Sequence, residues 1–262
     1  MKIKWYGTAS ILLEHDGSRL LFDPFIPINK KAYKPPIEEL AAIENIFITH
    51  GHYDHVSDVP AIFKKGNGKQ NIYCTATPRA TLVSKGVDEN CIKIINPQDV
   101  LNIGSFTIRV LKGKHIIFDT WQILKTLFNF RIFTNWKNLR HILKEHKHYD
   151  EAGETVVYEI SAAGKQILLL GSLNLDDNTE YPKDADLLVL PFQGRSDINK
   201  YAMNFIGRLQ PKKILLDHFD DTFPPISATV NPRVFIKVMK QKYPDVSVIY
   251  TQPGAEWIEV KF

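Results

Sequence analysis

Four potential metal ligands stand within six residues in the stretch Thr49-His50-Gly51-His52-Tyr53-Asp54-His55. Neutral imidazole and carboxylate groups are the natural protein ligands of zinc and related first-row ions. His50 and His52 are two apart in an extended loop, so both can reach one point, and Asp54 and His55 would face a neighbouring point. A solvated polar turn is the alternative, but such a dense group of ligands is costly to arrange unless cations hold it.

The sequence around this stretch alternates predicted strands with predicted helices. Strand patterns occupy residues 2–6, 10–14, 19–22 and 45–49, and later ones lie near Val156, Leu168, Leu188, Leu215 and Val248. Helical patterns occupy residues 38–44, 58–65 and 78–85 and recur near Phe205 and Val238. The length of 262 residues suits one large α/β domain better than two small ones, so we expect a single domain over 1–262.

Residues 118–149 break this alternation. The segment mixes aromatic side chains with Lys and Arg and lacks the period of a strand, so it is predicted to form one or two amphipathic helices inserted between sheet elements. Its faces would suit a lid over a substrate, a membrane-surface contact or a homo-oligomer interface. Packing against the sheet is the favoured expectation.

Two further histidines follow predicted strands, as the dense stretch does. His115 comes after the strand that ends near Leu111, and His218 stands in Leu215-Leu216-Asp217-His218. Either one alone is weak evidence, since a single His after a strand is more often a hydrogen-bonded residue than a ligand. His15, His141, His146 and His148 are expected to be solvated surface residues.

The run His50-Gly51-His52-Tyr53-Asp54-His55 resembles the His-x-His-x-Asp-His signature of the metallo-β-lactamase superfamily. The opening strands, with Trp5-Tyr6-Gly7-Thr8-Ala9-Ser10 and Leu21-Phe22-Asp23-Pro24, resemble that superfamily as well. The resemblance implies a four-layer αββα sandwich carrying the helical insertion 118–149. It also implies that His50, His52 and His115 bind one metal ion and that Asp54, His55 and His218 bind a second.

The chain departs from the superfamily pattern at one position. A metal-bridging Asp usually follows the strand at 167–171, where this chain has Gly171-Ser172. Ser172 or Asp176 is a candidate to act there instead, and the loss of one negative ligand should weaken the shared position. Asp23 and Asp220 are candidates for the shell behind the ligands.

The bulk composition limits the partners and the compartment. The net charge of +4, from 33 basic and 29 acidic residues, is too small to make nucleic acid the expected partner. No apolar run approaches the ~20 residues that cross a bilayer, and no signal-peptide pattern is present, so we expect a cytoplasmic protein. Cys74 and Cys91 are too few for a thiolate zinc site.

The predicted function is a metal-dependent hydrolase in which a metal-bound hydroxide cleaves a small-molecule ester, lactone or phosphodiester, with Asp54 orienting the hydroxide. Zinc is the expected cofactor, as one or two ions, with manganese or iron as alternatives. The outline resembles the ascorbate-phosphate lactonase branch, and Arg195 is a candidate for contacting an anionic substrate. Alternatives are an RNA or DNA phosphodiesterase of the same fold and a metal-binding module without catalysis. A di-iron redox enzyme is less favoured, because such relatives typically carry Glu at the position of His52.

Overall fold

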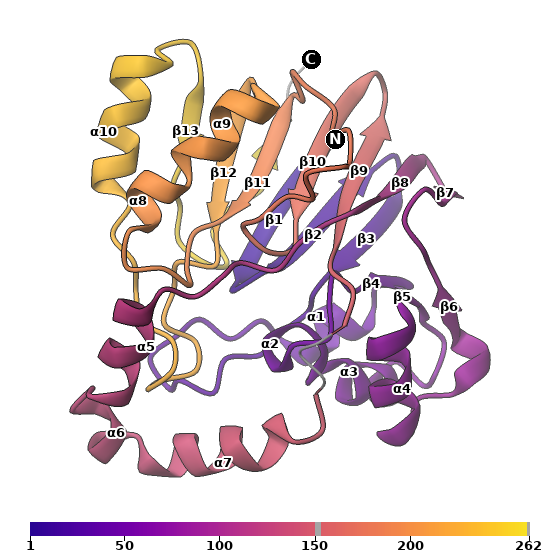
Figure 1. Cartoon of the computed structure of the whole chain (residues 1–262). Coiled ribbons are helices and arrows are strands. Elements are labelled where there is room, and N and C mark those ends of the chain that lie inside the picture. Colours follow the sequence, from indigo (N-terminus) through magenta and orange to yellow (C-terminus); the bar gives the residue numbers. More distant parts are fainter. Residues whose placement is uncertain (150–152, 261–262) are drawn as a thin grey trace.

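The computed structural model describes residues 1–149 and 153–260 and contains two seven-stranded sheets packed face to face (Figure 1). The first sheet has the order β14-β1-β2-β3-β4-β5-β6. Its strands are β1 (Lys2–Gly7), β2 (Ser10–His15), β3 (Ser18–Phe22), β4 (Asn45–Phe47), β5 (Asn71–Cys74), β6 (Ile92–Ile94) and β14 (Ile258–Glu259). Pairing is antiparallel from β14 to β3 and parallel from β3 to β6, so the sheet is mixed.

The second sheet has the order β13-β12-β11-β10-β9-β8-β7 and the same plan. Its strands are β7 (Val100–Ile103), β8 (Phe106–Lys112), β9 (Val156–Ala162), β10 (Lys165–Leu170), β11 (Leu187–Pro191), β12 (Lys213–Asp217) and β13 (Ser247–Ile249). An antiparallel meander from β7 to β10 leads into a parallel part from β10 to β13. The two halves share this architecture although their sequences show no repeat.

Apolar side chains that alternate along the strands fill the space between the sheets. Trp5, Phe22 and Phe47 of the first sheet and Phe106 and Tyr158 of the second belong to one buried cluster. Burial of such large side chains is the main favourable term in folding. This shared core fixes the two sheets against each other.

Helices cover the outer face of each sheet. The first sheet carries α1 (Ile37–Ala41), α3 (Val59–Lys65) and α4 (Ala76–Ser84), whose buried side chains form a second cluster with the back of the sheet. The second sheet carries α8 (Ile198–Tyr201), α9 (Met203–Leu209) and α10 (Arg233–Lys242) (Figure 1). The order of layers is therefore αββα, which confirms the predicted fold class.

The insertion forms three short helices, α5 (Thr120–Leu127), α6 (Arg131–Thr134) and α7 (Trp136–His146). They run along the lower edge of the molecule, outside both sheets (Figure 1). Only Ile142 and Tyr149 are buried among the side chains described in this segment. The expectation that the insertion mainly packs against the sheet is therefore wrong, because most of the apolar side chains described in it face solvent or the pocket described below.

Some short elements were not predicted, and one predicted strand is longer than the observed one. β4 ends at Phe47, two residues before the predicted end at Thr49, because the chain turns there into the histidine stretch. The one-turn helix α2 (Tyr53–Val56), helix α8 and strand β14 are too short to leave a periodic pattern. Among the described residues, no helix is long and apolar enough to span a bilayer.

Candidate metal centre

The six predicted ligands lie where strands of both sheets end. The histidine stretch follows β4 of the first sheet, and α2 begins immediately after His52, which places Asp54 and His55 on a single helical turn. His115 follows β8 of the second sheet by three residues, and His218 follows β12 directly. Six side chains from three distant parts of the sequence therefore meet at one edge of the sandwich.

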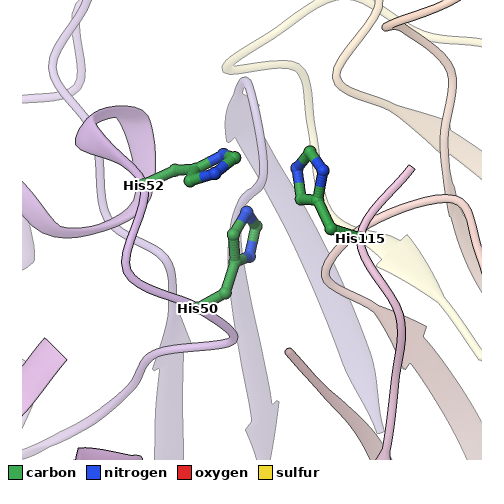
Figure 2. Close-up of side chains that lie close together, drawn as sticks. All are labelled: His50, His52 and His115. Atoms are coloured by element: carbon green, nitrogen blue, oxygen red, sulfur yellow. The ribbon is translucent and has the colours of Figure 1, made fainter. Parts of the chain in front are cut away.

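The structure divides these side chains into two groups of three. The ligand atoms of His50, His52 and His115 lie within 4.8 Å of one another, and so do those of Asp54, His55 and His218. Figure 2 shows the three rings of the first group turned toward a common point, with ring centroids of His52 and His115 4.3 Å apart. This division matches the two predicted ligand sets, and the role of each residue as a ligand stays a prediction.

Asp23 and Thr49 hold two of the rings from behind. The Thr49 hydroxyl donates to Asp23 Oδ2 at 2.6 Å, so it can only accept from His50 Nδ1, which lies 2.9 Å away. His55 Nδ1 donates to the same Asp23 oxygen at 2.8 Å. In the tautomer that donates from Nδ1, each neutral ring has its Nε2 lone pair free to bind a metal ion. The expectation that Asp23 stands behind the ligands agrees with this geometry.

Two other rings are held in the same way. His115 Nδ1 donates to the carbonyl oxygen of Ile116 at 2.8 Å, and His218 Nδ1 donates to Gln193 Oε1 at 3.0 Å. The Nε2 atom of His115 again remains for coordination, whereas that of His218 faces Asp54 Oδ2 at 3.0 Å. Sequence reasoning missed Gln193, whose amide carries no pattern that marks it as a partner of His218.

The donor set fits a divalent cation. His50 is 3% exposed, and its Nε2 has no hydrogen-bond partner in the described part of the chain. A buried polar atom without a partner is costly, and a bound ion would satisfy it. Imidazole and carboxylate donors without any thiolate suit zinc, and also manganese or iron.

The ionisable groups of the second group shift one another's pKa values. Burial alone would raise the pKa of Asp54, but His55 and His218 hold it well below its usual range. Burial would lower the pKa of His218, but Asp54, whose Oδ2 lies 3.0 Å from His218 Nε2, raises it to about 9. In the first group, burial and the neighbouring rings lower the pKa of His50 and keep it neutral. Neutral imidazole is the form that coordinates a metal ion, so an ion in the second group would displace the proton that His218 Nε2 shares with Asp54.

The backbone at His218 is held in an unusual conformation. His218 has φ 57°, a left-handed value that is rare outside glycine and that clusters at functional sites. Its amide donates to the Thr8 carbonyl at 2.9 Å, and Asp220 Oδ1 accepts from the Thr8 amide at the same distance. Asp220 thus fixes the backbone beside His218, whereas Gln193 orients the ring.

Ser172, which stands where the resemblance predicts a bridging carboxylate, lies beside the candidate ligands. Its hydroxyl accepts from the Ile116 amide at 2.9 Å and lines the pocket, so its own proton remains available to a group inside. Asp176 does not reach this place. Its carboxylate accepts hydrogen bonds from the Asn178 amide and the Thr179 hydroxyl, and its Oδ2 lies 3.3 Å from Lys112 Nζ. These contacts hold the carboxylate away from the candidate ligands.

Arg195 also lies apart from the candidate ligands. Its guanidinium donates to Asp197 and to the Ile117 carbonyl and stacks on Tyr201, and the residue is absent from the pocket lining. The predicted contact with an anionic substrate stays a prediction, and Asp197 and the Ile117 carbonyl already engage part of the guanidinium.

The ligands form the floor of a pocket of about 370 Å³, a size typical of small-molecule sites. Phe118, Ile142 and Leu143 of the insertion line one side, and Phe223 and Ile226 line another. His146 also lines this pocket. Its side chain is exposed, as predicted. The arrangement is polar at the floor and apolar at the walls.

A profile of the β-lactamase superfamily domain matches residues 2–218. The chain belongs to the metallo-β-lactamase superfamily. A UPF0173 metal-dependent hydrolase of Methanopyrus kandleri is 26% identical over 260 residues, covering 98% of this chain and 99% of the relative. Membership in this superfamily accounts for the shared sheet plan and for the position of the histidine-rich centre.

Two further superfamily members show the range of similarity. A UPF0173 metal-dependent hydrolase of Rhizobium johnstonii is 34% identical over 116 residues, so the match spans about half of that relative, 48%, and 44% of this chain. A solved metallo hydrolase from Ignicoccus hospitalis is 19% identical and covers 99% of both chains with a TM-score of 0.63, which shows the fold. None of these names concerns ascorbate phosphate, so the branch predicted from sequence stays a prediction.

Proposed function

We propose that this metal-dependent hydrolase of the metallo-β-lactamase superfamily binds zinc and cleaves an ester, lactone or phosphodiester in a small, largely apolar molecule. The observation that carries the proposal is the pair of ligand groups on the floor of one pocket. A bound zinc ion lowers the pKa of water from about 16 to about 7 and polarises a carbonyl or phosphoryl oxygen. The relatives named metal-dependent hydrolases support this reaction class.

Asp54 has two tasks in this proposal. Its low pKa keeps it ionised at neutral pH, so it can bind the second ion and accept a hydrogen bond from the attacking water. His218 and His55 fix the carboxylate, since their Nε2 atoms lie 3.0 Å and 3.8 Å from its Oδ2. A carboxylate held in this way needs no rearrangement when the substrate arrives.

The pocket walls favour a small substrate with apolar parts. Phe118, Ile142 and Leu143 of the insertion line the pocket together with Ile226. A lid of this kind excludes water around the reacting bond. A lactone or an aryl or acyl ester would pack against these walls. Such a substrate is consistent with the predicted lactonase-like branch.

Ser172 sets the expected metal content. A hydroxyl replaces the negative ligand that usually lies between the ions, so the second ion should be held more weakly than in relatives with a carboxylate there. We expect about two equivalents of zinc in the purified chain, with one of them removed first by dialysis against a chelator. Elemental mass spectrometry measures both amounts.

Variants assign each ion to its group. His50→Ala should remove the ion of the first group and His218→Ala that of the second, whereas His148→Ala, an exposed histidine outside both groups, serves as the matched control. The zinc-loaded chain is then assayed with a lactone, an aryl ester, a phosphodiester and a short RNA. Turnover of RNA alone would favour the nuclease alternative, and stable zinc binding with no turnover of any substrate would favour a non-catalytic module.

A further inference from the structure

The corner formed by α5, α6 and α7 carries an unusual set of exposed aromatic side chains. The exposed fraction is 83% for Phe128, 75% for Phe130, 77% for Phe133 and 60% for Trp136. The rings of Phe130 and Phe133 lie with centroids 5.8 Å apart. We call these four residues the aromatic corner. Exposed apolar groups gathered in this way mark interaction sites far more often than single exposed residues do.

A row of cations continues from this corner along α7. Lys137, Arg140, Lys144 and Lys147 follow one another at intervals of three or four residues, so they share one face of the helix, and all four are exposed. Within the described residues no carboxylate pairs with any of them. We call these four residues the cationic row. It points away from the pocket, which Ile142 and Leu143 line from other positions of the helix.

The acidic residues of the insertion do not neutralise this face. The segment 118–149 holds six Lys and Arg against two acidic residues, a net +4 that equals the charge of the whole chain. Asp119 accepts from Ser196, and Glu145 binds Lys85 on α4 at 2.8 Å. Both carboxylates are therefore turned inward, and the outer face remains cationic.

We propose that the aromatic corner and the cationic row form a docking surface for an anionic lipid bilayer. Trp and Phe side chains enter the interface between head groups and acyl chains, while Lys and Arg beside them contact anionic head groups. Figure 1 shows α5, α6 and α7 strung along one edge of the molecule, where a flat surface can meet them without contacting the sheets. The surface is separate from the metal ligands and does not depend on the proposed reaction.

The charge pattern favours a bilayer over a second copy of the chain. A two-fold dimer presents the same face on both partners, so its cationic rows would approach each other near the symmetry axis. Like charges in such an interface destabilise it. An anionic bilayer is complementary to the row along its whole length.

The test is co-sedimentation of the full-length, zinc-loaded chain with vesicles. We expect binding to phosphatidylcholine mixed with phosphatidylserine, weaker binding to phosphatidylcholine alone, and loss of binding as salt screens the cations. Lys137→Ala with Lys144→Ala should weaken binding about twenty-five-fold, since each basic residue near an anionic surface contributes about fivefold. Phe128→Ser with Phe133→Ser should weaken it at least about tenfold.

The matched control lies on α10, which also carries exposed lysines. Lys237→Ala with Lys240→Ala removes the same charge from a face without an aromatic corner and should leave vesicle binding within about twofold of the original. Equal losses in this control would overturn the proposal, because the effect would then be net charge alone. Vesicle binding that is absent, or that ignores lipid charge and salt, would overturn it as well.

Analytical ultracentrifugation distinguishes the rival occupant. A dimer that becomes monomeric with Phe128→Ser and Phe133→Ser, in a chain that does not bind vesicles, would assign the surface to a second copy and refute the bilayer. A monomer that binds vesicles supports it. Zinc content and thermal melting should be unchanged in all variants, because none of these residues touches the pocket or the core.

Discussion

Thr49→Val tests whether the network behind the histidines controls metal binding. The change removes one hydroxyl that donates to Asp23 at 2.6 Å and accepts from His50 at 2.9 Å. His50 Nδ1–H then has no acceptor, which costs about 1–3 kcal/mol for a buried donor. A methyl group also cannot approach the Asp23 oxygen as closely as the hydroxyl does, so the His50 ring should shift.

We expect Thr49→Val to weaken zinc binding tenfold to a hundredfold, the usual effect of losing a group behind a ligand, or about 1.4–2.8 kcal/mol. Competition with a chromophoric chelator measures this affinity, and circular dichroism monitors folding. Thr49→Ser, which keeps the hydroxyl, should retain most of the affinity.

Thr75→Val is the matched control for this experiment. Thr75 is also buried, but its hydroxyl has no hydrogen-bond partner within the described residues, so its loss should be neutral or slightly stabilising. Equal zinc affinity in the original chain and Thr49→Val would refute the reasoning. Equal losses in both valine variants would attribute the effect to general loosening of the fold.

Three other changes test different parts of the structure. Asp54→Asn should lower kcat at least about a hundredfold, while the melting temperature of the variant stays close to that of the original chain. An active variant would contradict the role of the carboxylate. Gly171→Ala should destabilise the chain and lower its zinc content, because the added Cβ would lie 2.2 Å from Thr49 Cβ; an unchanged melting temperature would contradict this. Burial raises the pKa of Asp58 to about 6, above its unfolded value of about 4. The protonated form therefore stabilises the fold below about pH 4, and this stabilisation is lost as the pH rises through about 6. Asp58→Asn should therefore flatten the stability profile across that window and stabilise the chain at pH 7 by about 1–3 kcal/mol, which urea unfolding at several pH values measures.

The sequence predicted the regular parts of the fold because they leave local signals. The alternation at 2–6 and 10–14 corresponds to β1 and β2, and the histidine stretch follows β4 as expected. Pro60 indicates the first turn of α3, where proline costs no hydrogen bond. Short elements such as α2 and β14 depend on tertiary contacts, so the pattern of their few residues does not predict them.

The candidate ligands were predictable for the same reason, whereas their supporting groups were not. The spacing of His50, His52, Asp54 and His55 is itself a signal. Gln193 lies 25 residues before His218 and meets it only because β11 and β12 are adjacent parallel strands. Arg195 was predictable as an arginine in a loop near the site, but its hydrogen bond to Asp197, two residues later, was not.

Each group of ligands draws on both sheets, and this has a consequence for the lifetime of the protein. His50 and His52 stand on the first sheet and His115 on the second, and the same division separates Asp54 and His55 from His218. An ion bound in either group would cross-link the two halves as a disulfide does, but a competing chelator could remove it. Because binding to the folded state alone adds about 2.7 kcal/mol at a hundredfold excess over Kd, scarcity of the ion would loosen the halves and expose the chain to proteolysis. The amount of this protein in a cell should therefore follow the supply of its metal.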